Sequence, residues 1–463
     1  MERIMTRVPT LARREFLRIG AASLAGYHLL PMVQPLAVQA AGKVRPRGTA
    51  EYCIFLFLSG GASHVDTFDL KEGAWTPPDF DIRTIRGGPL KLPFALYPKL
   101  AERTDDLAIV RSMEAWETAH PRAQYYMQVA HAISPARRSE MPSVGAVVTY
   151  EMEARRKPSD FLPPFIAMNY GGGAGVVGAG CLSPKLNPLV FDTKTQLDFV
   201  VPDAERQRFD RRWDLLRNME REGRSDGVST LDPVEAFRAH HERAHSMMLA
   251  PGIDRILKVQ SEERTRYGSS PFGDACILAR NLIAAEAGAR YIFISQGSWD
   301  SHTDIYDKTK PDNVYRHSLD LDQGFASLLA DMSQIKTADG SRLLDKTLIV
   351  CTGEFGRTVG PVTLNLGRDH YRWAFTSLFA GGGVRGGRLI GATDAAGAKV
   401  VQGGWSQKRS VYPEDLAATI YSAMGLDYSK KITNTPSGRA FEYLEPFSAT
   451  TFMQPSEIET LFT

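Results

Sequence analysis

The run Thr347-Leu348-Ile349-Val350-Cys351-Thr352 passes directly into Gly353-Glu354-Phe355-Gly356-Arg357-Thr358. Apolar and β-branched residues in an unbroken run, ended by a glycine, predict a strand that is buried on both faces. Such strands belong to parallel sheets, and open α/β sheets form their binding sites at the carboxyl ends of the strands. The polar residues after Thr352 therefore predict a functional site at one edge of a parallel sheet.

Two other strand-like runs end in the same kinds of residue. Tyr52–Leu58 and residues 291–295 each precede a segment that contains aspartate and histidine, and a similar segment follows Arg357. The residues concerned are His64, Asp66, Asp300, His302, Glu354, Asp369 and His370. Because the carboxyl ends of parallel strands meet at one edge, we expect these side chains to form a single composite site.

The rest of the chain alternates strands and helices. Further strands are predicted at 107–111, 164–168 and 374–380, and helices at 122–133, 143–155, 272–288, 317–335 and 413–424. This alternation predicts an α/β fold, a large and mostly parallel sheet sandwiched by helices. Residues 202–267 are crowded with charged side chains and predict a helical insertion or cap within the domain.

Composition is that of a globular protein. The chain has 463 residues, of which 43% are apolar and 23% are charged. The formal net charge is +2, and no basic stripe interleaved with aromatic residues is present, so nucleic acid is not expected as a partner. Four scattered cysteines without a CxxC pair leave both buried thiols and a disulfide open.

The amino terminus has the features of a twin-arginine export signal over residues 1–40. Arg13-Arg14-Glu15-Phe16-Leu17-Arg18 precedes an apolar stretch broken by glycine and proline, which ends in Ala37-Val38-Gln39-Ala40-Ala41. An amphipathic or core helix is the alternative, but small residues suited to cleavage after Ala40 favour a signal. We therefore expect the twin-arginine export machinery as a partner and no stable membrane span. The mature domain, residues 41–463, is expected to be periplasmic or extracellular.

The residues at the strand ends are those that divalent metal ions accept as ligands. Carboxylate and imidazole groups bind Zn, Ca, Mg or Mn, and we predict one or two such ions held by the seven residues named above. Each segment also has a structural interpretation: Asp66 can open an Asx turn, Asp300 can hold its loop, and Asp369-His370 can form a surface ion pair. Their recurrence at separate strand ends favours a site, since those loops have no structural need to share these residue types.

Four residues are predicted to act on the substrate. Arg357 follows Glu354 closely and forms either an ion pair or a clamp for an oxyanion, and Arg111 is a second candidate clamp. Thr118 and His120 precede a predicted helix, where a nucleophile or an anion is favoured, although helix capping also explains them.

With these residues in view, the chain resembles the domain-of-unknown-function 1501 family, exported proteins of the alkaline phosphatase and sulfatase superfamily. The matching phrases are Gly60-Gly61-Ala62-Ser63-His64-Val65-Asp66-Thr67-Phe68-Asp69, Trp299-Asp300-Ser301-His302, Gly353-Glu354-Phe355-Gly356-Arg357-Thr358, Gly367-Arg368-Asp369-His370 and Ala380-Gly381-Gly382-Gly383-Val384-Arg385-Gly386-Gly387. They occur in the family's order over residues 51–444. The resemblance implies an alkaline phosphatase-like fold with the metal and the nucleophile at one edge of the sheet.

The superfamily pattern is met only in part. Ser59-Gly60 stands where the superfamily usually has an aspartate, and Glu354-Phe355 stands where its hydrolases have Asp-His. Asp300 and His302 resemble the superfamily's metal pair, and His370 resembles its final histidine ligand. The nucleophile position falls near Thr118, without the Cys or Ser pattern of sulfatases.

These observations predict an exported, metal-dependent hydrolase of phosphate or sulfate esters. Its substrate would be an anionic ester or a sulfated or phosphorylated glycan. The alternative is a non-catalytic, degenerate family member that acts as a cell-surface binding or assembly component. The missing imidazole at Phe355 favours the alternative, whereas acids and arginine at separate strand ends favour the hydrolase.

Overall fold

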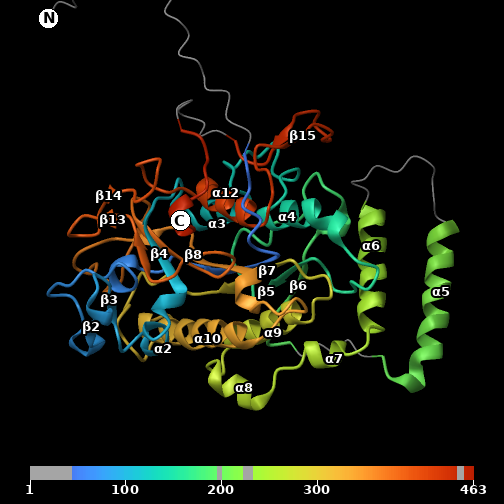
Figure 1. Cartoon of the computed structure of the whole chain (residues 1–463), viewed down its shortest axis with the longest axis horizontal. Coiled ribbons are helices and arrows are strands. Elements are labelled where there is room, and N and C mark those ends of the chain that lie inside the picture. Colours follow the sequence, from blue (N-terminus) through green and yellow to red (C-terminus); the bar gives the residue numbers. More distant parts are fainter. Residues whose placement is uncertain (1–43, 196–200, 223–232, 446–452) are drawn as a thin grey trace, which may run out of the picture. The chain divides into compact units, whose positions relative to one another are not determined.

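Among the residues that the structure describes, eight strands form the central sheet, in the order β12-β4-β11-β8-β1-β7-β5-β6. The computed structural model describes residues 44–195, 201–222, 233–445 and 453–463, so the predicted signal peptide lies outside the described residues (Figure 1). The strands are β1 (Tyr52–Leu58), β4 (Leu107–Met113), β5 (Phe165–Met168), β6 (Leu189–Phe191), β7 (Tyr291–Gln296), β8 (Thr347–Gly353), β11 (Phe375–Ala380) and β12 (Arg388–Ile390). β11 runs antiparallel to its neighbours β4 and β8, and the other pairings in the sheet are parallel. The prediction of a large, mostly parallel sheet is confirmed.

The central strand β1 shows why these strands are apolar along their length. All of its residues are buried, and alternate side chains enter different cores. Ile54 and Leu56 belong to the core on one face, whereas Phe55 and Phe57 belong to the core on the other. The Phe55 ring stacks on that of Phe293 in β7, with centroids 5.4 Å apart. A parallel sheet that is covered on both faces therefore needs no polar residue in a central strand.

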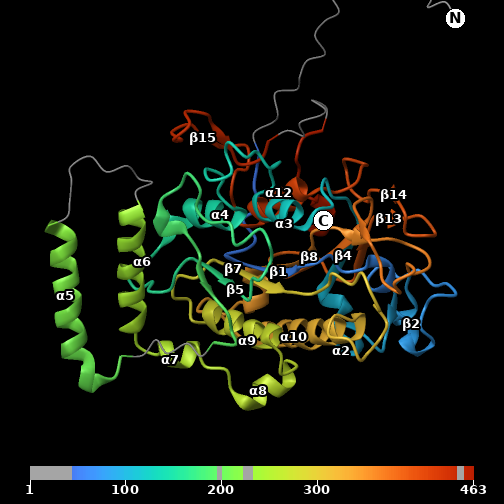
Figure 2. The same ribbon diagram turned by 180° about the vertical axis from the view of Figure 1, so that it is seen from behind.

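Helices cover both faces of the sheet, as Figures 1 and 2 show. One face packs against α2 (Pro98–Ala101), α9 (Pro271–Ala284), α10 (Val314–Gln334) and α11 (Leu343–Lys346), and the other against α3 (His120–Val129), α4 (Val144–Met152) and α12 (Pro413–Ala423). Asn313 caps α10 by accepting from the Arg316 N–H at 3.0 Å. α3 begins at His120, earlier than predicted, because Pro121 is tolerated in the first turn, where an N–H lacks a helical partner.

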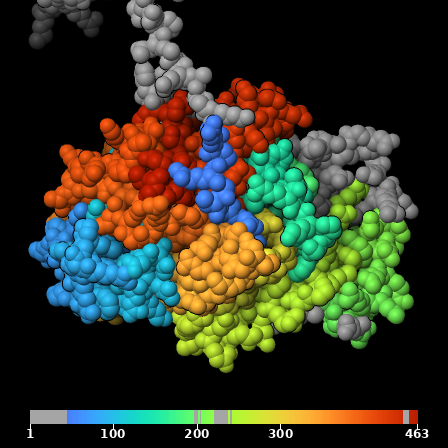
Figure 3. Space-filling view, viewed as in Figure 1, coloured from blue at the N-terminus to red at the C-terminus, as the bar shows by residue number. Residues whose placement is uncertain are grey.

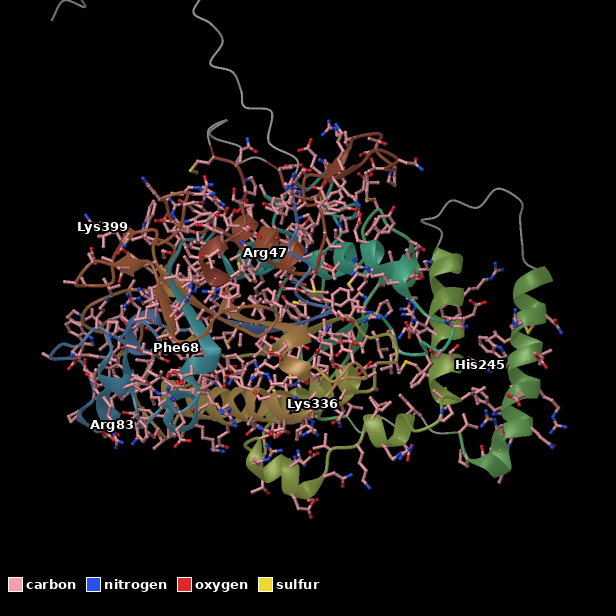
Figure 4. All side chains as sticks on the ribbon, in the orientation of Figure 1. Arg47, Phe68, Arg83, His245, Lys336 and Lys399 are labelled. Atoms are coloured by element: carbon pink, nitrogen blue, oxygen red, sulfur yellow. The ribbon has the colours of Figure 1, made fainter. Side chains whose placement is uncertain are left out.

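The segment predicted as a helical insertion contains α5 (Arg206–Glu222), α6 (Pro233–Met248), α7 (Ile253–Ile256) and α8 (Ser261–Arg266). α5 and α6 lie side by side beyond the β6 end of the sheet, not over its face (Figures 1 and 2). His245 of α6 points toward α5 (Figure 4), and its ring stacks on that of Trp213 with centroids 4.3 Å apart. Arg243 anchors α6 by donating to the Asn187 carbonyl, next to β6, at 3.3 Å.

Within the described parts of the chain, four two-stranded pairs lie outside the central sheet: β2 (Ile82–Thr84) with β3 (Lys91–Pro93), β9 (Gly356–Arg357) with β10 (His370–Tyr371), β13 (Ala392–Thr393) with β14 (Val400–Gln402), and β15 (Lys431–Ile432) with β16 (Phe441–Glu442). Figure 3 shows the blue β2–β3 segment beside an orange segment that follows β11, although the two are far apart in the sequence. β12, which lies in the segment after β11, pairs in parallel with β4. The four cysteines are free thiols. Within the described ranges, no helix is long and apolar enough to cross a membrane.

Candidate metal centre

The candidate site lies at the carboxyl edge of the sheet. β1, β4, β7 and β8 point the same way, so their carboxyl ends share this edge. The loops after β7 and β8 carry Asp300 and Glu354, and the loop after β4 leads to His120 at the start of α3. The β9–β10 pair sets His370 opposite Arg357. Side chains from separate segments of the chain thereby converge on one place.

His120, Asp300, His302 and His370 form a compact cluster, in which one ligand atom from each side chain lies within 4.8 Å of the others. Asp300 is at its centre. Its Oδ1 atom lies 3.1 Å from His120 Nε2, 3.0 Å from His302 Nε2 and 3.4 Å from His370 Nε2. Three imidazoles and a carboxylate form a donor set that suits a divalent transition metal such as Zn. The Asp300 side chain is 42% exposed, so the cluster opens to solvent.

In each of the three histidines, the nitrogen that faces away from Asp300, Nδ1, is hydrogen-bonded to an oxygen atom. The pairs are His120 Nδ1 to Glu354 Oε1 (2.7 Å), His302 Nδ1 to Asp369 Oδ1 (2.9 Å) and His370 Nδ1 to the Thr118 carbonyl (2.6 Å). Because carbonyl and ionised carboxylate oxygens only accept, each Nδ1 carries the hydrogen and each Nε2 can present a lone pair to the cluster. Metal-bound histidines are held in the same way, with the outer nitrogen donating to an oxygen.

One contact inside the cluster calls for a cation. The Nε2 atoms of His302 and His370 lie 2.9 Å apart. With both Nδ1 atoms protonated, two lone pairs face each other at this distance. Arg357 Nη1 lies 3.5 Å from His302 Nε2, and a proton or a metal ion between the rings would compensate both lone pairs. The donor set therefore fits a divalent ion.

Arg357 lies beside the cluster and is 1% exposed. Its guanidinium contacts Asp300 Oδ1 at 2.5 Å and donates to the main-chain carbonyls of Gly60, Gly61 (3.0 Å) and Arg368 (3.0 Å). These contacts make Arg357 the residue that fixes the position of Asp300. Of the two roles predicted for Arg357, the geometry corresponds to the ion pair.

Glu354 supports the cluster from its buried side and is 1% exposed. Its Oε1 atom accepts from the Gly60 N–H (2.9 Å), His120 Nδ1 (2.7 Å) and Gln124 Nε2 (3.4 Å). Glu354 thus lies behind His120, as Asp369 lies behind His302, in the place from which carboxylates orient metal-bound histidines. Both residues were predicted as direct ligands, and the structure places both one contact outside the four-residue cluster.

The charges of the cluster depend on one another. Burial lowers the pKa of His120, but hydrogen bonds with Asp300 and Glu354 outweigh burial and raise that pKa to about 9. Burial raises the pKa of Asp300, but hydrogen bonds from His120, His370 and Arg357 hold it well below its usual range. Without a metal, a proton on His120 therefore offsets part of the carboxylate charge. Metal binding must displace that proton, because a ligating imidazole is neutral.

His64 and Asp66 were predicted as metal ligands, but the structure places them in a separate buried group. His64 is 0% exposed, and its Nε2 atom donates to the Gly397 carbonyl at 2.8 Å. Asp66 pairs with Arg368, whose Nε atom lies 2.6 Å from Asp66 Oδ2. The chain forms a short 3₁₀ helix at His64–Asp66 with all its residues buried, so these side chains pack inward instead of reaching the cluster.

Two predicted catalytic residues have structural contacts of their own. The Arg111 guanidinium donates to the Gly391 carbonyl (3.1 and 3.3 Å) and lies 3.6 Å from Asp69. Arg111 thus holds the turn between β12 and β13 against β4. Thr118 lies in the loop before α3, and its carbonyl is the acceptor for His370 Nδ1. Thr118 therefore borders the cluster through its main chain.

Two residues that shape the site were not predicted as part of it. Arg368 is fully buried and neutralises Asp66. Gln124 of α3 donates to both Ser59 Oγ (3.2 Å) and Glu354 Oε1 (3.4 Å). A buried carboxylate requires a cation, so Arg368 in the phrase Gly367-Arg368-Asp369-His370 could have been predicted from the sequence as the partner of a buried acid. Gln124 carries no motif or spacing that marks it.

The fold and the cluster define an α/β protein with a candidate metal centre at the carboxyl edge of its sheet. The chain belongs to the family described as "Protein of unknown function (DUF1501)", whose profile matches residues 50–449. The resemblance drawn from the strand-end motifs is confirmed. A comparison with curated proteins found no match.

Several solved structures are similar to this chain. A protein in the alkaline phosphatase superfamily from Vibrio parahaemolyticus is 14% identical, with a TM-score of 0.37 over 83% of this chain and 69% of that one. The lipoteichoic acid synthase LtaP from Listeria monocytogenes is 8% identical, with a TM-score of 0.36 over 87% of this chain and 76% of that one. The phosphonate monoester hydrolase SpPMH from Silicibacter pomeroyi is 11% identical, with a TM-score of 0.32 over 81% of this chain and 73% of that one. Likenesses as distant as these do not identify a reaction.

Proposed function

We propose that the protein is an exported, metal-dependent hydrolase of phosphate or sulfate esters. The orientation of three histidines carries the proposal. Each Nδ1 atom of these histidines, His120, His302 and His370, is hydrogen-bonded to an oxygen atom. Their Nε2 atoms and the Asp300 carboxylate therefore face one another. Proteins orient neutral imidazoles in this way for metal ions. Zn suits the set well, and Mn, Mg and Ca are the alternatives.

A divalent ion held by these residues would polarise the ester and activate water for attack. The protein's own residues have supporting tasks. Glu354 and Asp369 keep His120 and His302 in the ligating orientation, and Arg357 holds the Asp300 carboxylate in place. The exposed side of Asp300 leaves room for the ester group.

Water and the Thr118 hydroxyl are the two candidate nucleophiles. Thr118 is exposed, and it belongs to the loop whose carbonyl receives the His370 hydrogen bond. A Thr118→Ala variant that keeps turnover assigns the attack to water. Loss of turnover with intact metal content assigns it to Thr118.

A second candidate function is a non-catalytic binding or assembly role at the cell surface. Phe355 favours it, because this buried ring stands where the superfamily pattern has an imidazole. It packs against the rings of His120 and His370, at centroid distances of 5.0 and 4.7 Å. The substitution removes a ligand that a second ion would need, so we expect one ion at the cluster. A single ion serves a structural role as readily as a catalytic one.

Turnover separates the two candidates. Purified protein loaded with Zn or Mn is assayed on 4-nitrophenyl phosphate, bis(4-nitrophenyl) phosphate and 4-nitrophenyl sulfate. The hydrolase predicts turnover of at least one ester, lost in Asp300→Ala and His370→Ala. Glu72→Ala is the matched control, because this exposed carboxylate pairs with Lys91 on the surface. If the metal-loaded protein turned over none of the three esters, the result would contradict the hydrolase and favour the non-catalytic binding role.

Export through the twin-arginine pathway is part of the proposal and would place the protein in the periplasm or outside the cell. It rests on Arg13-Arg14 and the small residues around Ala40, which lie outside the described residues. Fractionation of cells that make the full chain should find the wild type outside the cytoplasm. The paired substitution Arg13→Lys and Arg14→Lys should retain the protein inside, and an unchanged distribution would contradict this route.

A further inference from the structure

A cavity of about 430 Å³ opens beside the metal cluster. Two loops are common to both. Ser59 lines the cavity, and the next residue, Gly60, donates to Glu354 at 2.9 Å. Ser298 also lines the cavity and stands two residues before Asp300. The volume is within the usual range of small-molecule sites, about 300–1,000 Å³. The two shared loops bring the cavity near the cluster, and its volume suffices for the organic part of an ester.

Two buried polar atoms of the cavity wall have no hydrogen-bond partner among the described residues. They are Ser295 Oγ, on β7, and His317 Nε2, on α10. Ser295 is 3% exposed and His317 is 7% exposed. Asp312 Oδ1 lies 3.7 Å from His317 Nε2, which is beyond hydrogen-bond distance. Leaving buried polar groups unpaired is unfavourable, so two of them in one cavity point to a ligand that supplies the missing hydrogen bonds.

The remaining walls of the cavity are polar and carry both charges. Asp192, Asp312 and Asp320 offer carboxylate acceptors, whereas Lys194 and Arg316 offer cationic donors. An aryl or alkyl group offers these groups no hydrogen bonds, although Asp192 Oδ1 already accepts from the Lys194 N–H at 2.8 Å. Hydroxyl groups both donate and accept, so a hydroxyl-rich ligand can satisfy the carboxylates, the cations and the two unpartnered atoms together.

The charge state of His317 agrees with such a ligand. Burial lowers the pKa of His317 to about 4, so its imidazole is neutral at neutral pH. A neutral ring hydrogen-bonds to a hydroxyl group without attracting a second anion into the cavity.

A second hollow, of about 670 Å³, continues along the start of α10. Both hollows are lined by Pro311, Arg316 and Asp320. The wall of the second hollow also contains Lys308 and Lys310. A ligand in the first cavity therefore has room to continue beyond one sugar ring.

We propose that the cavity binds the carbohydrate part of the substrate, with Ser295 and His317 hydrogen-bonding to its hydroxyl groups. The inference rests on the proposed ester hydrolase, whose metal cluster would hold the ester group of the same molecule. It names the substrate class as phosphate or sulfate esters of sugars, in preference to aryl esters and nucleotides.

The test compares two variants on two kinds of ester. Ser295→Ala and His317→Phe each remove a buried polar atom without a hydrogen-bond partner among the described residues, so the thermal midpoint should stay unchanged. KM for glucose 6-phosphate or glucose 6-sulfate should rise about fivefold for each lost hydrogen bond. KM for the corresponding 4-nitrophenyl ester should stay within about twofold, because the phenyl group makes no such bond.

Matched controls are a buried serine and a buried histidine whose polar atoms are paired. Ser327 donates to the Arg266 carbonyl (3.1 Å), and His131 contacts the Val129 and Glu442 carbonyls (2.7 and 2.9 Å). Ser327→Ala and His131→Phe should lower the thermal midpoint and leave KM for both kinds of ester unchanged. The two pairs of variants thus separate ligand binding from structural damage.

Calorimetric titration of glucose 6-sulfate into metal-free protein separates this inference from the proposed hydrolase. Binding that weakens in Ser295→Ala and His317→Phe supports the carbohydrate site even if no ester is turned over. Turnover of aryl esters with no dependence of sugar-ester KM on these residues overturns it. Failure of the protein to bind any sugar ester overturns it, and so does a dependence on Ser295 and His317 that appears only for adenosine monophosphate.

Discussion

Asp369 Oδ1 lies 2.9 Å from His302 Nδ1, so a carboxylate that is 63% exposed orients a histidine of the metal cluster. We expect Asp369→Asn to lower the affinity for the metal about 10- to 100-fold, as the loss of a carboxylate behind a metal-bound histidine does. Competition with a fluorescent chelator measures the affinity. Glu72 is a surface carboxylate paired with Lys91, and its variant Glu72→Gln should bind the ion as the wild type does. If Asp369→Asn bound the metal with the affinity of the wild type, the contact between Asp369 and His302 would be a surface ion pair without a role in metal binding.

The buried pair of Asp66 and Arg368 is expected to stabilise the fold and not to bind the ion. Arg368→Met leaves the Asp66 carboxylate buried without its cation, which should cost about 3–5 kcal/mol of the free energy of unfolding. Urea denaturation measures the loss, and addition of Asp66→Asn should recover part of it. Folded Asp66→Asn should keep the metal content of the wild type. If that variant lost the ion, Asp66 would be a metal ligand and this prediction would be wrong.

Gly60 is required by the turn that brings the first strand to the cluster. Its φ is +106°, and a Cβ there would lie 2.5 Å from the Asp300 main-chain nitrogen. Gly60→Ala should therefore displace the Asp300 loop, weaken metal binding and cost about 1–3 kcal/mol of stability. Gly297→Ala is the control, because its Cβ would meet nothing within 4 Å. Equal effects of the two substitutions on metal binding would contradict this role of Gly60.

The buried carboxyl of Glu414 should make stability depend on pH. Burial raises the pKa of Glu414 from 4.5 to about 8, and Trp116 Nε1 donates to it at 3.1 Å. Below about pH 4.5 the carboxyl is protonated in both states. As the pH rises toward about 8, the unfolded chain loses this proton first, so the free energy of unfolding falls. Urea denaturation of the wild type should show this fall relative to Glu414→Gln, and parallel pH profiles would contradict the raised pKa.

The sheet was predictable because burial on both faces leaves a continuous apolar run. β1 and β8 are central strands and were recognised with nearly their observed bounds. β6 and β12 were not predicted because each has three residues and lies at an edge of the sheet, where most of its residues are not fully buried. A short strand at an edge has neither the length nor the burial that sequence patterns register.

The place of the site was predictable from the sequence, but the residues that form it were predictable only in part. Asp300 reaches the cluster, whereas Asp66 turns inward to Arg368, although both follow strands. Position after a strand indicates the edge of the sheet and not the direction of the side chain. The place of Glu354 behind His120 depends on a contact between residues 234 apart in the chain. No local pattern encodes such a contact.

The central claim is that His120, Asp300, His302 and His370 bind one divalent ion. Elemental analysis of the purified protein, before and after incubation with Zn or Mn and removal of excess ion, tests it directly. The account predicts about one equivalent of metal in the wild type and a loss of nearly all of it in the double variant His302→Ala and His370→Ala. His245→Ala, which changes a histidine stacked on Trp213, should keep the full equivalent. Wild-type protein that takes up no divalent ion, or a double variant that retains one, would contradict the claim.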